Sequence, residues 1–122
     1  MARKFSGPAP LPPGLFRYLI DHETEVLGGA LSNGGNMIAW ISNLSQSKDR
    51  REMMRQASLI APDGHGLTML PFFAGERAPS WHDHLRGTIT GMSLDTTNIH
   101  ILRAMMEATA YRFSSVYDAL RE

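Results

Sequence analysis

Segment 31–40, LSNGGNMIAW, joins a strand-like stretch to a helix-like stretch, with Gly34 and Gly35 at the junction. Backbone N–H groups at the start of a helix lack partners within the helix and, together with the helix dipole, attract anions. Because glycine has no Cβ atom, a phosphate can approach its backbone closely. Two interpretations stay open: a phosphate-binding turn, or a tight strand-to-helix turn without a ligand.

Segment 81–87, WHDHLRG, contains His82, Asp83 and His84, whose side chains are of the types that bind zinc. Alternate residues of a loop usually point in different directions. The other histidines that could complete a site, His65 and His100, are distant in sequence. We therefore expect solvated loop side chains here and no metal site.

Two further groups of polar residues have both a chemical and a structural interpretation. Arg103 and Glu107 are four positions apart in a helix-like segment, which favours an ion pair. Glu107 becomes a candidate general base only if it is buried, and a structural carboxylate is the alternative. Ser32 with Asp21 and His22 does not form a convincing nucleophile arrangement, since nothing in the spacing brings them together.

Arg77 and Arg86 flank a long polar loop. They can hold a phosphate or carboxylate through paired hydrogen bonds. Alternatively, they fix the loop to Glu76 or Asp83.

These residues depend on a succession of short strands and helices. Two β-type runs, 15–20 and 26–31, are separated by DHETE and predict a hairpin. A helix is expected from Asn36 to about 45–47, and the charged segment 47–56 gives a weaker helical signal. Segments 67–73 and 87–94 are further strand candidates.

The last third of the chain has the strongest periodicity. From about Asn98 the apolar residues recur every three or four positions, which predicts a long amphipathic helix. Asp95, Thr96 or Thr97 can cap its N-terminus. Together the elements predict an α/β fold in which helices pack against a mixed sheet.

Length and composition limit the function classes. A chain of 122 residues predicts a single domain, with 1–14 as a proline-rich lead-in and 15–122 as the folded part. Twelve basic residues balance twelve acidic ones, so no nucleic-acid or membrane-surface partner is expected. No apolar run has the length of a membrane span, and cysteine is absent, so we expect a cytoplasmic protein.

Three segments together resemble the C-terminal domain of the FGGY carbohydrate kinases, a family that includes gluconate, xylulose and glycerol kinases. They are LPFFAGERAPSW, RGTITGM and HILRAMMEATAY. The residues that match the spacing of the family's second signature are Gly87, Ile89, Gly91, Met92, His100, Ile101, Ala104, Met105, Met106 and Glu107. Upstream, VLGGALSNGGNMIAW is similar to the family's strand, glycine turn and tryptophan-bearing helix, and GERAPSW favours the gluconate and pentulose kinase branches.

This resemblance implies part of an actin-like, ribonuclease-H-like ATPase domain. Such kinases transfer the γ-phosphoryl group of ATP to a sugar hydroxyl with the help of Mg²⁺ and an aspartate base. That aspartate belongs to an N-terminal domain with no counterpart here. Gly35 occupies the position whose backbone contacts nucleotide phosphates in glycerol kinases, so Gly35 and the adjacent Gly34 are the expected cofactor-binding residues.

Two departures from the family pattern matter. Ala39 stands where glycerol kinases have a glutamine that touches the nucleotide, so that contact is lost. Trp81 is followed by His82 and Asp83 instead of Asp-Pro or Asn-Pro, and we expect the GERAPSW loop to be structural. The family's Gly-Thr turn and its glycine-rich adenosine motif are also missing.

The sequence therefore suggests a fragment of an ATP-dependent sugar kinase that is inactive alone. The substrate of the intact enzyme would be a sugar or sugar acid. The alternative is a noncatalytic interaction module derived from a kinase half, which binds the missing part of the kinase or self-associates.

Overall fold

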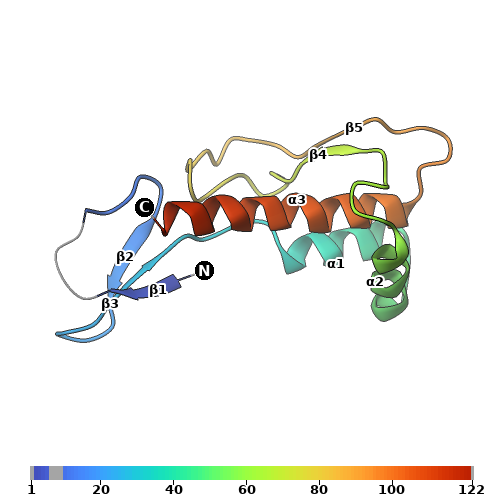
Figure 1. Ribbon diagram of the computed structural model, residues 1–122. Helices are drawn as coiled ribbons and strands as arrows, with labels where there is room; N and C mark the ends of the chain where they lie inside the picture. Colours follow the sequence, from blue (N-terminus) through green and yellow to red (C-terminus); the bar gives the residue numbers. More distant parts are fainter. Residues whose placement is uncertain (1, 6–9, 122) are drawn as a thin grey trace.

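The computed structural model describes residues 2–5 and 10–121, as three helices and five strands (Figure 1). The elements in chain order are β1 Ala2–Phe5, β2 Phe16–Leu19, β3 Glu25–Gly28, α1 Gly35–Leu44, α2 Arg50–Leu59, β4 Thr68–Leu70, β5 Thr88–Thr90 and α3 Asn98–Ala119. All three predicted helices are present. The predicted hairpin is formed by β2 and β3.

The long helix α3 is the axis of the molecule. In Figure 1, α1 and α2 lie on one side of α3, and β4 and β5 lie on the other. Of the three candidate caps, Thr97 is the N-cap: its side chain accepts the His100 N–H, and His100 Nδ1 accepts the Thr97 N–H. This reciprocal pair satisfies two N–H groups at the start of α3.

Two groups of buried side chains hold these layers together. The larger lies between α1, α2, β4 and α3 and includes Met37, Ile41, Met53, Ala57, Leu67, Met69, Leu102 and Met105. The smaller joins the C-terminal end of α3 to the β2–β3 hairpin and consists of Leu15, Leu27, Ala78, Val116 and Leu120. The apolar residues of α3 thus pack in two separate groups of buried side chains.

The α/β fold class is as predicted, but the strands do not form one mixed sheet. They pair in a three-stranded sheet of order β1-β3-β2 and a two-stranded sheet of β4 and β5, all antiparallel. A short connection such as that between β2 and β3 favours an antiparallel hairpin. Strand β4 is shorter than expected because Pro71, which has no N–H to donate, follows it directly.

Strand β1 lies within the stretch 1–14 that was predicted to be a proline-rich lead-in. It pairs along β3, with Ala2 opposite Gly28 and Phe5 opposite Glu25. Four residues carry too little periodicity to be recognised as a strand from sequence. Here the free edge of β3 provides the hydrogen-bond partners.

Candidate functional site

The Gly34–Gly35 turn faces open space. Gly34 is the N-cap of α1, with an extended φ of −171°, and Gly35 is the first helical residue. A Cβ atom added to either glycine would meet no atom within 4 Å. A ligand can therefore approach this backbone without displacing any described residue.

Asn36 already uses part of the helix N-terminus. Its Oδ1 accepts the Gly34 N–H at 2.7 Å and the Met37 N–H at 3.1 Å, and its Nδ2 donates to the Ser32 carbonyl at 3.1 Å. Within the described residues, the N–H groups of Gly35 and Asn36 at the start of α1 have no hydrogen-bond partner. Asn36 thus takes up two N–H groups of the turn, because asparagine side chains bond to nearby backbone.

An apolar cavity of about 250 Å³ adjoins the turn. It lies between α1 and α3, and Met54 of α2 closes part of it. The other side chains that line it include Met37, Ile38, Met105, Met106 and Phe113. Polar N–H groups and an apolar cavity therefore lie side by side at the start of α1.

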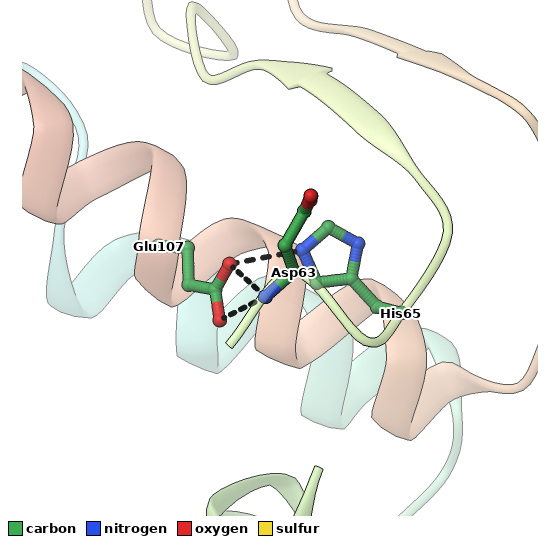
Figure 2. Close-up of side chains that lie close together, drawn as sticks. All are labelled: Asp63, His65 and Glu107. Carbon is green, nitrogen blue, oxygen red and sulfur yellow. Dashed lines mark hydrogen bonds and ion pairs between the residues drawn. The ribbon is translucent and has the colours of Figure 1, made fainter. Parts of the chain in front are cut away.

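A second cluster lies on the opposite face of α3 and consists of Asp63, His65 and Glu107 (Figure 2). Glu107 accepts hydrogen bonds from the Asp63 main-chain N–H at 3.1 and 3.3 Å and from His65 Nε2 at 3.1 Å. Arg103 Nε donates to Glu107 at 2.6 Å, which confirms the predicted ion pair. Asp63 and His65 were not predicted as partners of Glu107, because they are more than forty residues away from it in the sequence.

Each of the three side chains offers one atom of a type that binds metals, and these atoms lie within 4.8 Å of one another. The hydrogen bonds of His65, however, oppose metal binding. His65 Nδ1 accepts the Leu67 N–H at 3.0 Å, so Nε2 carries the proton and donates to Glu107. A metal ion would need the lone pair of one ring nitrogen, but Nδ1 already accepts the Leu67 N–H and Nε2 carries the proton. The Arg103 guanidinium adds positive charge beside Glu107, which favours the structural interpretation of this carboxylate.

The hydrogen bonds to Glu107 predict a dependence of stability on acid. Burial raises the pKa of Glu107, but the bonds from Asp63, Arg103 and His65 outweigh it and hold the pKa below its ordinary value of 4.5. The stabilisation is fully present above about pH 4.5 and is lost as the pH falls through the lower folded pKa. We expect Glu107→Gln to flatten the fall of the thermal midpoint as the pH is lowered below about 4.5. Parallel curves for the two proteins would contradict this assignment.

The other histidines do not assemble into one group. His82 and His84 lie in the exposed loop, with 55% and 73% of their side chains accessible. Their ring centroids are 5.5 Å apart. His65 lies at Glu107, and His100 caps α3.

The GERAPSW loop is anchored by contacts within the fold. Arg86 donates to the main-chain carbonyls of Asp83 and Leu85, which supports the loop-fixing alternative for this arginine. Arg77 is exposed. Glu76 is buried and pairs with neither of the two candidates: its carboxylate binds Arg112 of α3.

The three residues weighed as a nucleophile group remain apart. Asp21 and His22 lie exposed between β2 and β3, where His22 contacts Glu23 at 3.6 Å. Ser32 lies in the connection from β3 to α1, and its carbonyl binds Asn36. No hydrolase site follows from them.

Comparison with known proteins identifies the family. The model of the FGGY family of carbohydrate kinases, C-terminal domain, matches residues 8–122. The chain belongs to the FGGY family of carbohydrate kinases. Among curated relatives of this family, glycerol kinase of Corynebacterium efficiens is 35% identical over 105 residues, covering 84% of this chain and 21% of the relative. Gluconokinase of Bacillus subtilis is 30% identical over 119 residues, covering 88% of this chain and 23% of the relative.

Solved structures of FGGY kinases share the fold. Xylulose kinase from Lactobacillus acidophilus matches with a TM-score of 0.81 and 24% identity, over 98% of this chain and 25% of that one. Plasmodium falciparum glycerol kinase with ADP matches with a TM-score of 0.70 and 27% identity, over 83% of this chain and 20% of that one. The chain thus spans a fifth to a quarter of its relatives. None of the helices described has the length and apolar character needed to cross a membrane.

Proposed function

We propose that this chain forms part of the nucleotide-binding wall of an ATP-dependent sugar kinase. The complete enzyme would transfer the γ-phosphoryl group of ATP to a hydroxyl of a sugar or sugar acid. The observation that carries the proposal is the open Gly34–Gly35 turn at the N-terminus of α1, in a member of a carbohydrate kinase family. The N–H groups of Gly35 and Asn36 would bind a phosphate oxygen of ATP.

The residues at the turn fit a nucleotide phosphate better than a metal ion. Free N–H groups at a helix start donate to anions, and both glycines leave the approach open. Mg²⁺ usually binds through carboxylates and substrate phosphates. We propose that Mg²⁺ enters with ATP and that its protein ligands lie outside this chain.

We propose that the chain has no kinase turnover by itself. Phosphoryl transfer depends almost entirely on positioning and electrostatic stabilisation, which need both walls of a cleft. A chain that spans a fifth to a quarter of its relatives cannot supply both. An assay of ADP release with a panel of sugars and sugar acids should remain at the blank rate.

The turn is tested by Gly35→Val with Mg·ADP as the ligand. Because nothing lies within 4 Å of an added Cβ, the variant should fold as well as the wild type. Its side chain would nevertheless occupy the phosphate approach, and we expect the affinity for Mg·ADP to fall at least about tenfold. NMR titration of the Gly35 and Asn36 amides measures the binding directly.

Asn43→Val is the matched control for Gly35→Val, since Asn43 is exposed near the other end of α1. It should leave the affinity unchanged. Equal affinities for all three proteins would exclude the turn as the phosphate site. Shifts confined to other residues would exclude it as well.

A second candidate function is a noncatalytic module that assembles with another polypeptide. It is favoured by the exposed aromatic side chains of α3, Tyr111, Phe113 and Tyr117, and by the apolar cavity beside Gly34. Exposed apolar surface of this kind favours association. A concentration-dependent mass by light scattering, without nucleotide binding, would favour this function over the nucleotide wall.

A further inference from the structure

The residue that precedes the glycine pair is anchored to a distant segment. Asn33 is buried, with 9% of its surface accessible. Its Nδ2 donates to the Gly75 carbonyl at 2.9 Å, and its Oδ1 accepts the Ala74 N–H at 2.9 Å. Both ends of the side-chain amide therefore bond to two consecutive residues, which prevents the amide from rotating.

The segment that holds Asn33 is itself fixed. Gly75 has a φ of +70°, and a Cβ there would lie 2.5 Å from the Asp83 carbonyl oxygen, so the backbone is closely packed. Immediately after it, the buried Glu76 binds Arg112 of α3. The Arg112 guanidinium also lies over the Phe72 ring, 5.5 Å from its centroid. Segment 72–76 is therefore attached to α3 through Arg112.

We infer that Asn33 is a positioning residue. Its bonds to segment 72–76 hold the Gly34–Gly35 turn in the conformation that binds a ligand. This inference rests on the proposed function. Two consecutive glycines have more backbone freedom than any other pair, and an added Cβ at either one would meet no atom within 4 Å. Asn36 bonds only to residues 32, 34 and 37, so it shapes the turn without fixing it to the rest of the fold. Asn33 is the side chain that makes this connection. Holding the N–H groups in place before binding increases affinity.

Asn33→Ala in the full chain removes both bonds. We expect the ¹⁵N order parameter of Gly34 and Gly35 to fall from about 0.85 to below about 0.6 while α3 stays rigid. The affinity for Mg·ADP should fall about tenfold in protein that is still folded. Asn33→Asp keeps the acceptor for the Ala74 N–H but loses the donor to Gly75, so its order parameters at Gly34 and Gly35 should also fall below those of the wild type. If Asn33→Ala does not fold, the order parameters of Gly34 and Gly35 in Asn33→Asp test the inference instead.

Asn43→Ala is the control, and it should leave the order parameters of the turn unchanged. Unchanged order parameters at Gly34 and Gly35 in the Asn33 variants would overturn the inference, even if their thermal midpoints drop. Mobile glycines with unchanged Mg·ADP affinity would overturn it too. If the wild type does not bind Mg·ADP, the proposed function fails, while the order parameters still decide whether Asn33 holds the turn.

Discussion

Replacing Arg112 with methionine is expected to destabilise the chain by about 3 to 5 kcal/mol, because it leaves an uncompensated buried charge. The Glu76 side chain is only 5% accessible and binds the Arg112 guanidinium. Burial lowers the pKa of Arg112, but an arginine keeps its charge at neutral pH. His82 is a further neighbour of the carboxylate, with its Nδ1 3.7 Å from Glu76 Oε2. The His82 side chain is 55% accessible. The free energy of unfolding in urea measures the loss.

A double variant separates the charge from the packing. Glu76→Gln combined with Arg112→Met leaves no buried charge, so it should be more stable than Arg112→Met alone. Arg50→Met, at an exposed position in α2, is the control and should change stability by less than about 0.5 kcal/mol. An Arg112→Met loss as small as that of the control would show that the pair contributes nothing.

Gly14→Ala is expected to destabilise the chain by about 2 to 4 kcal/mol through backbone strain and overlap. Gly14 has a φ of +81°, and a Cβ there would lie 1.8 Å from the Pro79 carbonyl oxygen. The substitution would push the GERAPSW loop away and weaken the 2.7 Å hydrogen bond from Trp81 Nε1 to the Gly14 carbonyl. Thermal or urea unfolding measures the effect.

Gly66→Ala isolates the conformational part of that loss. Gly66 has a φ of +68° but no atom within 4 Å of an added Cβ. Gly66→Ala should therefore lose stability only through the cost of the left-handed backbone, about 1 to 2 kcal/mol. Equal losses for the two variants would mean that the contact with Pro79 relaxes freely.

The GERAPSW loop links these contacts to the candidate site. Glu76 joins it to α3, Gly14 packs against it, and Asn33, which precedes the Gly34–Gly35 turn, bonds to it. The loop contains none of the groups that we assign to phosphate binding. Its influence on the turn would be exerted through the position of Asn33.

The sequence alone determined the elements whose signal is local. The spacing of apolar residues predicted α1, α2 and α3, and the break at DHETE predicted the β2–β3 hairpin. The four-residue spacing of Arg103 and Glu107 predicted their ion pair. Each of these follows from residues within one or two turns of each other. For the glycine pair at the strand-to-helix junction, the sequence left two interpretations open, a phosphate-binding turn or a turn without a ligand.

Only the tertiary structure decided which distant residues meet. It paired Glu76 with Arg112, placed His65 on Glu107 and brought Asn33 to Ala74 and Gly75. It also divided the strands between two antiparallel sheets instead of one mixed sheet. These partners are 36 to 42 residues apart, and no sequence period relates them. A buried polar group bonds to whichever partner the packed core brings within reach, and that depends on how α3 lies between the layers.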